Sequence, residues 1–357
     1  MYRKRIKKVQ KYIKEENLDG FIVSRLVSIR YLCGFSGTSG LLIIRKNSAH
    51  FLTDFRYKDQ AQKQVEGAAI IITKGEIISE LKELTQFHGK NLRYGYETEY
   101  LSCNDRQRLQ NSLGNVLFLP MLNAVEEFSV VKDESEITLL KKAVDITDVA
   151  FERILGYLRP GLREREICAE LEYQMICLGS EKPGFETIVA SGFRSAMPHG
   201  VASDKKISLG DFVTFDFGAT YKGYVADLTR TVVIGKATLR QKKIYNIVLR
   251  AQLAAIRKVR AGIKAKIVDR AARNVIEKNG YGKYFGHGLG HGIGIYIHSK
   301  PSVGPRSTDI LKKGMVITIE PGIYLPGWGG VRIEDDVLVT TRGCVVLSKS
   351  SKKLLEV

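Results

Sequence analysis

The sequence predicts a mixed α/β protein (α+β) made of two domains, the second of which contains an internal repeat. Strand-like and helix-like segments alternate through the first third of the chain, and two later stretches align with each other. The 357 residues are 44% hydrophobic, which is ample for two cores of ordinary size.

Residues 1–128 form the first predicted domain. It opens with a basic helix whose apolar residues Ile6, Val9 and Ile13 recur at helical spacing. This helix leads into a strand over 21–24. The strand-like segments of the domain are 22–35, which overlaps this first strand, 40–47, 49–57, 68–72, 92–97 and 116–120. Helices are predicted over 58–65, 76–87 and 103–113. This alternation is typical of a complete α/β domain.

The second predicted domain covers residues 129–357 and follows a break in the pattern near residues 127–132. Asp133 and Glu136 have the spacing of a capping box, in which each side chain caps a backbone N–H near the start of a helix. Apolar residues at helical spacing follow over 137–158. A long helix is therefore expected at the start of this domain.

An internal repeat organises the second domain. Residues 158–179 align without gaps on residues 259–280, and residues 208–216 align on residues 312–320. Each half therefore reads as helix, helix and a hairpin that carries a carboxylate. The same offset brings His199 close to His298, so the two halves are expected to present one histidine each to a shared cleft.

Four carboxylates mark the two predicted hairpins. Asp216 ends one apolar run and Asp227 begins the next, and a turn at residues 221–222 would set them nearly opposite. Glu320 and Glu334 flank a turn-rich segment in the same way. An ionised carboxylate at the end of a buried strand is costly unless a cation neutralises it. Both the number of these carboxylates and their positions at the ends of strands therefore indicate that they are ligands of a metal ion.

Three of the six histidines, His287, His291 and His298, fall within residues 283–336 among closely spaced glycines. Four carboxylates and His291 make five ligands, and no cysteine is nearby. This oxygen-rich set suits manganese, iron, cobalt or zinc better than a structural zinc site.

Composition excludes several other classes of protein. No run of eighteen apolar residues exists, and the five scattered cysteines indicate free thiols in a cytoplasmic protein. The net charge of +18 divides into +7 over residues 1–132 and +11 over residues 133–357. Only residues 3–14 form a dense basic run. Without a basic-aromatic motif, we expect neither a nucleic-acid partner nor a membrane partner.

Several motifs resemble one known family, the pita-bread metallopeptidases, and within it the proline-specific branch of aminopeptidase P and prolidase. In the second domain they are MPHG (197–200), GHGIG (290–294), IHSKP (297–301), EPGIY (320–324) and GVRIEDD (330–336). In the first domain they are IRYLCGFSGTSG (29–40) and TDFRYKDQA (53–61). The resemblance covers nearly the whole chain and implies a pita-bread fold for the second domain.

The resemblance also implies roles for the five ligands. Asp227 and Glu334 match carboxylates that bridge two metal ions. Asp216 matches a ligand of one ion, and His291 with Glu320 match the ligands of the other. Two divalent ions per subunit are expected, manganese first, with cobalt or zinc as alternatives. Glu320 is also the expected proton shuttle.

The remaining site residues would contact substrate. His199 and His298 match histidines that stabilise the reaction intermediate, and His287, Tyr324 and Arg332 match positions that line the substrate pocket. The sequence departs from the family at Ser299, where a glutamate is usual. This departure leaves the ligands unchanged and affects the charge around His298.

The implied function is a cytoplasmic Xaa-Pro aminopeptidase, a homodimer that acts on short peptides with proline in second position. A metal-bridging hydroxide would cleave the Xaa-Pro bond at the N-terminus of the peptide. A dipeptide-specific prolidase is the alternative within the class. A pita-bread protein that has lost catalysis is the alternative outside it, and the five ligand positions argue against that interpretation. The additional first domain argues against a methionine aminopeptidase.

Overall fold

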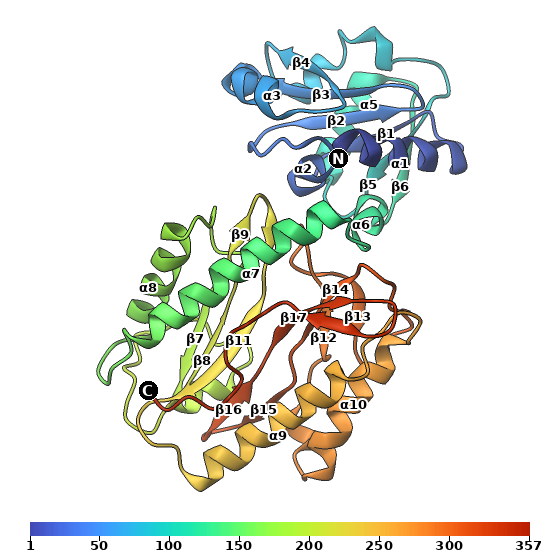
Figure 1. Cartoon of the computed structure of the whole chain (residues 1–357). Helices are drawn as coiled ribbons and strands as arrows, with labels where there is room; N and C mark the ends of the chain where they lie inside the picture. The colour runs from blue at the N-terminus through green and yellow to red at the C-terminus, as the bar shows by residue number, and fades with distance from the viewer. The chain divides into compact units, whose positions relative to one another are not determined.

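The computed structural model describes all residues, Met1 to Val357, and divides into two compact units, Met1–Ser129 and Val130–Val357 (Figure 1). Both units combine helices with sheets, which confirms the mixed α/β class. None of the helices is both long enough and apolar enough to cross a membrane. All five cysteines are free thiols.

The first unit is built on one six-stranded sheet with the strand order β4-β3-β2-β1-β5-β6. The strands are β1 (Gly20–Val23), β2 (Leu41–Arg45), β3 (Ala49–Asp54), β4 (Ala69–Thr73), β5 (Arg93–Glu97) and β6 (Leu117–Met121). The helices are α1 (Tyr2–Glu15), α2 (Leu26–Cys33), α3 (Lys58–Gln64), α4 (Ile77–Glu80), α5 (Cys103–Leu113) and α6 (Ala124–Ser129). The alternation predicted from the sequence is largely confirmed.

Two predicted elements of the first unit are wrong in part. The strand expected over 22–35 ends at Val23, and α2 follows it. The buried carboxylate of Glu97 accepts hydrogen bonds from the backbone N–H groups of Ser24 and Arg25, at 3.0 and 2.9 Å, and so caps the start of this helix. The helix expected over 76–87 is only α4 and a short 3-10 turn. Local apolar spacing could not reveal the capping carboxylate, because it comes from a distant strand.

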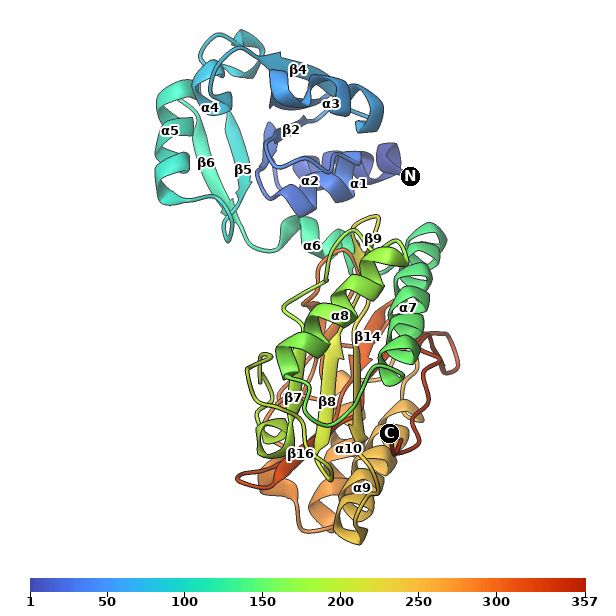
Figure 2. The ribbon, with the colours of Figure 1, turned by 90° about the vertical axis from the view of Figure 1, so that its left-hand side faces the viewer.

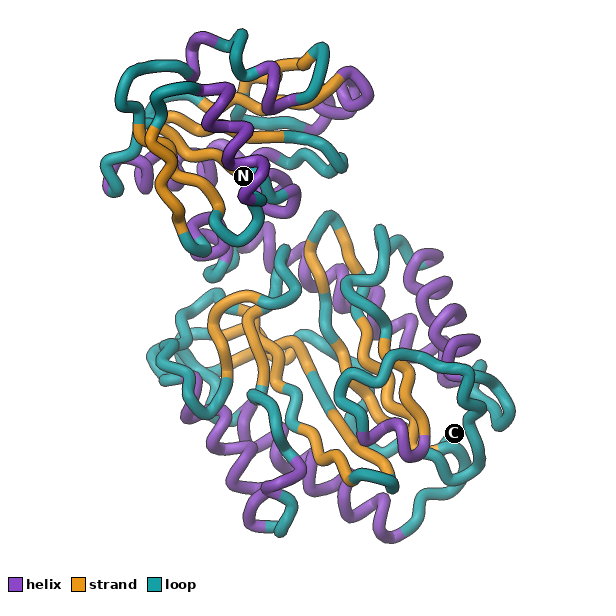
Figure 3. The backbone as a smooth tube through the Cα atoms, turned by 180° about the vertical axis from the view of Figure 1, so that it is seen from behind, coloured by secondary structure: helices purple, strands orange, loops and turns teal.

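The second unit consists of two halves, each with helices on the outside of a small sheet (Figures 2 and 3). The helices are α7 (Glu134–Leu155), α8 (Glu164–Cys177), α9 (Leu239–Ile256) and α10 (Ala265–Lys278). The predicted capping box of Asp133 and Glu136 is present at the start of α7. Helices α8 and α10 occupy equivalent positions in the two repeats.

The first half contains a sheet of order β11-β8-β7, and the second a sheet of order β13-β12-β14-β17-β18. The strands are β7 (Ile188–Ser191), β8 (Phe212–Phe217), β11 (Leu228–Val233), β12 (Gly290–Gly292), β13 (Ser299–Val303), β14 (Val316–Ile319), β17 (Asp335–Val339) and β18 (Cys344–Val346). The short hairpins are β9 (Thr220–Tyr221) with β10 (Tyr224–Val225), and β15 (Gly322–Leu325) with β16 (Gly329–Arg332). Each half has its own apolar core, which fixes the strands that carry the predicted ligands.

The register of the first hairpin differs from the expected one. The turn lies at Lys222 and Gly223, which have positive φ angles of 47° and 83°. This conformation suits a two-residue hairpin turn and moves the turn one residue along the chain. Asp216 therefore pairs with Thr229, two residues beyond Asp227. A shift of two residues keeps a side chain on the same face of a sheet, so both aspartates still face the same side.

Candidate metal centre

One cavity of about 770 Å³ in the second unit brings together the residues singled out in the sequence. All ten line it: His199, Asp216, Asp227, His287, His291, His298, Glu320, Tyr324, Arg332 and Glu334. They come from both repeats and span 136 positions of the chain, from 199 to 334. The cleft expected between the two halves is therefore present.

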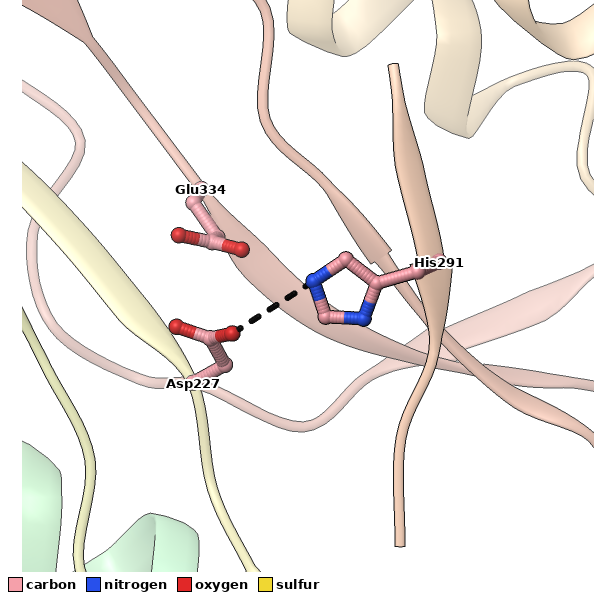
Figure 4. Close-up of side chains that lie close together, drawn as sticks. All are labelled: Asp227, His291 and Glu334. Atoms are coloured by element: carbon pink, nitrogen blue, oxygen red, sulfur yellow. Dashed lines mark ion pairs between the residues drawn. The ribbon is translucent and has the colours of Figure 1, made fainter. Parts of the chain in front are cut away.

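Three of the side chains that line the cavity form a group that could hold a metal ion (Figure 4). One ligand atom from each of Asp227, His291 and Glu334 lies within 4.8 Å of the others. His291 Nε2 is 3.7 Å from a carboxylate oxygen of Asp227 and 3.6 Å from one of Glu320. These separations leave room for a cation among the four groups.

The second hairpin places its two glutamates opposite each other. Ile319 pairs with Asp335 on one side of them, and Gly322 pairs with Arg332 on the other. If the pairing of either hairpin segment is continued along the two strands, Glu320 lies opposite Glu334. The predicted pairing of these two carboxylates is therefore confirmed.

His291 is held with one ring nitrogen directed at the acids. Its Nδ1 lies 3.2 Å from the carbonyl oxygen of Gly292, and its backbone N–H donates to Thr318 Oγ1 at 3.1 Å. Because a carbonyl can only accept, Nδ1 carries the proton and Nε2 offers its lone pair to the acidic group. The flanking glycine at 290 is required, since a Cβ there would lie 2.1 Å from the Thr318 carbonyl oxygen.

The acidic group contains carboxylate oxygens with no partner in the protein. Asp227 Oδ1 and Glu334 Oε1 are buried and accept no hydrogen bond. The other oxygen of Glu334 accepts from Thr229 Oγ1 at 2.6 Å. Burial first, and then the charge of a neighbouring glutamate, raise the pKa of Asp227 and that of Glu334 well above their ordinary values. Divalent cations would satisfy the unpartnered oxygens and offset the like charges, so the residues fit a metal centre.

Glu320 shares this environment. Burial raises its pKa to about 8, and the hydroxyl of Thr318 donates to its Oε1 at 3.2 Å. A carboxyl group that titrates near neutral pH can both accept and release a proton during a reaction. The pKa of about 8 applies to the metal-free chain, so the expected role of Glu320 as proton shuttle remains a prediction.

Asp216 has a different partner in the structure. Its Oδ2 accepts from the Arg332 guanidinium at 2.5 Å, and it does not belong to the group of three ligand atoms. It lies on β8 and lines the same cavity. The expected ligand role of Asp216 therefore remains a prediction.

A chain of polar contacts connects three further residues that line the cavity. His287 Nε2 lies 3.0 Å from the Tyr324 hydroxyl, which accepts from Arg332 at 2.9 Å. Arg332 also donates to the carbonyl oxygen of Pro198, next to His199, at 3.1 Å. Burial, and then the Arg332 charge, lower the pKa of His287 to about 4, and burial raises the pKa of Tyr324 to about 12. Both side chains are therefore neutral hydrogen-bonding groups near pH 7.

His298 lies against the predicted ligand His291. Their rings are 4.4 Å apart between centroids and steeply inclined, and burial lowers the pKa of His298. Ser299, which departs from the family pattern, turns its hydroxyl to the carbonyl oxygen of Lys300, 3.3 Å away. His298 is therefore placed to face the cavity as a hydrogen-bonding group beside the ligands.

Part of the cavity wall was not predicted from the sequence. Apolar side chains from both halves complete it: Phe185, Ile188, Pro198, Val201 and Ile297. Pro198 and Ile297 lie within the motifs MPHG and IHSKP, whereas Phe185, Ile188 and Val201 carry no pattern that distinguishes them from ordinary packing residues.

The raised carboxylate pKa values give the metal-free protein a distinctive pH dependence. The pKa of Glu320 is about 8 in the folded chain, against an ordinary 4.5. The folded protein therefore keeps a proton that the unfolded chain releases in this range. The resulting stabilisation is present below the ordinary pKa and is lost as the pH rises to 8. We expect the melting temperature of the chelated protein to fall as the pH rises from about 6.5 to about 8. Below this range the lowered pKa of buried histidines such as His287 acts in the opposite direction.

Two controls define this test. Metal-loaded protein should show no such fall, because bound cations replace the protons. Chelated Glu320→Gln should show a shallower fall, because one titrating group is gone. A melting temperature of the chelated protein that rises steadily over this range would contradict the burial of charge described above.

Two family models together match most of the chain. Residues 138–341 match the model of metallopeptidase family M24, and residues 5–131 match the creatinase/prolidase N-terminal domain. The chain is 37% identical to an Xaa-Pro dipeptidase of Pyrococcus horikoshii, over 98% of each chain.

Two solved structures extend the likeness to the fold. An Xaa-Pro dipeptidase from Bacillus anthracis matches with a TM-score of 0.95 and 43% identity, over 100% of both chains. An X-Pro aminopeptidase from Thermotoga maritima matches with a TM-score of 0.90 and 38% identity, over 96% of this chain and 98% of the other. The chain belongs to metallopeptidase family M24, the pita-bread family, and carries the creatinase/prolidase N-terminal domain.

Proposed function

We propose that the chain is a metal-dependent peptidase that hydrolyses Xaa-Pro bonds, with Xaa-Pro dipeptides as its main substrates. The observation that carries this proposal is the buried acidic group, which contains two carboxylate oxygens without a partner and lies beside His291 in a cavity of peptide size. The likeness to an Xaa-Pro dipeptidase over the full length of both chains supports the substrate class.

Proline explains why such a substrate needs a dedicated site. The Xaa-Pro bond is a tertiary amide without an N–H, so the usual backbone donor is missing. An enzyme must instead recognise the pyrrolidine ring and the two ends of the peptide. The apolar wall that includes Phe185, Ile188 and Ile297 suits the ring, and the neutral His287–Tyr324 pair suits a polar terminus.

Five side chains would hold two divalent ions in this proposal: Asp216, Asp227, His291, Glu320 and Glu334. Bound there, the ions would polarise the scissile carbonyl and make a water molecule acidic enough to act as a nucleophile near neutral pH. Manganese is proposed first because carboxylates dominate the donor set, with cobalt and zinc as alternatives.

The remaining chemistry is assigned to side chains of the chain itself. Glu320, which lies among the proposed ligands, would take a proton from the attacking water and pass it to the leaving proline nitrogen. His298 and His199 would donate hydrogen bonds to the developing oxyanion and to the substrate carbonyl. Arg332 would orient Asp216 and Tyr324, both of which it contacts.

An Xaa-Pro aminopeptidase, which accepts longer peptides, is the second candidate. It is supported by the likeness to the Thermotoga maritima X-Pro aminopeptidase over nearly the whole of both chains. Both candidates use the same bond and the same ligands. They differ in what lies beyond proline, so turnover of Xaa-Pro and Xaa-Pro-Xaa peptides of matched sequence distinguishes them.

Metal removal tests the proposal as a whole. We expect the chain to cleave an Xaa-Pro dipeptide with added manganese or cobalt, to lose this activity after exhaustive chelation, and to regain it when the ion is restored. A matched Xaa-Ala dipeptide should be a poor substrate. Activity that survives complete removal of divalent ions, as verified by mass spectrometry, would refute the proposal.

We also propose that the enzyme is a cytoplasmic homodimer. The five free thiols are compatible with a reducing compartment. Sedimentation of the purified chain at several concentrations would give the subunit number.

A further inference from the structure

Two histidines that face the cavity, His199 and His287, lie on loops rather than on strands. His199 follows the 3-10 turn Gly192–Ala196, and His287 follows the 3-10 turn Gly282–Tyr284. A side chain on a loop is less precisely held than one on a strand, unless something fixes the loop from behind. In both cases the structure provides a buried carboxylate and an arginine.

The loop of His199 is fixed by Glu164, the first residue of α8, whose side chain is fully buried. One oxygen accepts from the backbone N–H and the hydroxyl of Ser191, at 2.7 and 2.8 Å. The other accepts from the backbone N–H and the hydroxyl of Ser203, at 3.0 and 2.6 Å, and from Arg194. Arg194 in turn donates to the carbonyl oxygen of Val201 at 2.8 Å. Glu164 therefore closes both ends of the segment that carries His199.

The loop of His287 is fixed by Asp269 and Arg273 on α10. The Asp269 side chain is fully buried and forms a two-point ion pair with Arg273, at 3.0 and 2.8 Å. The same guanidinium donates to the carbonyl oxygens of Phe285 and His287, at 2.9 and 2.8 Å, and lies over the Phe285 ring. Arg273 therefore contacts the backbone of the cavity histidine itself.

The two buried carboxylates that fix the loops, Glu164 and Asp269, occupy different positions in the internal repeat. In the alignment of residues 158–179 on 259–280, Glu164 matches Ala265, and Asp269 matches Cys168. Neither carboxylate therefore has an acidic counterpart at the equivalent position of the other half. The halves thus reach the same arrangement by different side chains, which indicates that each histidine loop requires an anchor.

We propose that Glu164 and Arg273 are positioning residues, called anchors below, that hold His199 and His287 in the positions that the reaction needs. This inference rests on the proposed function, because it concerns the same cavity. Neither residue lines the cavity, so neither contacts the substrate. A displacement of a catalytic group by about 1 Å can lower the rate a hundredfold. Loss of an anchor should therefore reduce turnover while the ligands stay in place.

Hydrogen exchange tests the anchors without any substrate. In Glu164→Gln, backbone exchange over residues 192–203 should rise at least tenfold, with residues 285–291 unchanged. In Arg273→Ala the pattern should be reversed. The controls are Arg165→Ala and Arg270→Ala. Both arginines lie on the same two helices and form exposed ion pairs, with Asp204 and Glu277 respectively. Unchanged exchange in both loops, or a rise over the whole unit, would overturn the proposal.

A double-mutant cycle tests whether each anchor acts through its histidine. Arg273→Ala should lower kcat/KM for an Xaa-Pro dipeptide about 10- to 100-fold with unchanged metal content. In a His287→Ala background the same change should cost less than about threefold, because the group that it positions is gone. Equal losses in both backgrounds would indicate a merely structural role and overturn the proposal.

The same cycle applies to Glu164→Gln with His199→Ala. If Arg273→Ala does not fold, Arg273→Lys keeps the charge but cannot reach Asp269 and both carbonyl groups together, and it replaces Ala in the cycle. If the native chain cleaves no Xaa-Pro peptide, the proposed function fails, and hydrogen exchange still decides whether the anchors hold the loops.

Discussion

Replacing Asp227 by asparagine should remove metal binding and nearly all turnover while leaving the protein folded. The amide keeps the shape of the side chain but loses the charge that both ions would share, and neutral amides bridge cations poorly. The backbone N–H of residue 227 would still donate to Asp336, 3.0 Å away in the native chain. Metal content by mass spectrometry and turnover of an Xaa-Pro dipeptide measure the effect.

The melting temperature separates this loss from unfolding. Because burial raises the pKa of Asp227, a neutral side chain is preferred at this position when metal is absent. Chelated Asp227→Asn should therefore be at least as stable as the chelated native chain. Asp145→Asn, in an exposed ion pair with Lys349, is the matched control and should change neither property. Full activity with two bound ions in Asp227→Asn would contradict the assignment.

Alanine at His291 and alanine at His298 should have different consequences, although the two rings touch. His291→Ala should lose one ion outright, since this ring supplies the only nitrogen among the five proposed ligands. His298→Ala should keep both ions and lose about a hundred- to a thousandfold in kcat, which is typical of removing one oxyanion donor.

Metal content and kcat, measured for both variants, decide between these roles. If His298→Ala loses metal as readily as His291→Ala, His298 is itself a metal ligand. Full turnover in His298→Ala would remove it from the reaction. Either result would show that the division between ligand and hydrogen-bond donor is wrong.

The internal repeat makes much of this site predictable. The match between residues 208–216 and 312–320 is enough to place Asp216 and Glu320 on equivalent strands. The pairing of Glu320 with Glu334 follows from the length of the segment between them, and the register confirms it. Spacing carries this information only up to the position of the turn, which in the first hairpin shifts the partner of Asp216 from Asp227 to Thr229.

Contacts between distant segments could not be predicted in the same way. Helix α2 lies where a strand was predicted, and the carboxylate of Glu97 caps its start. No local pattern in the sequence identifies Glu97 as a cap. Arg332 is expected from the sequence only to line the pocket, yet it also binds Asp216 across 116 positions of the chain. Glu164 and Arg273 likewise resemble ordinary charged residues at helical positions. Their roles depend on which loops the fold brings against them.

Anomalous diffraction from crystals grown with manganese tests the central claim most directly. If the cavity holds a dinuclear centre, two anomalous peaks should lie about 3.5–4 Å apart, both within ligand distance of Asp227 and Glu334. His291 should contact only one of the two. A map without a peak in this cavity, or with a single ion that touches neither bridging carboxylate, would contradict the proposed centre and the hydrolytic function that depends on it.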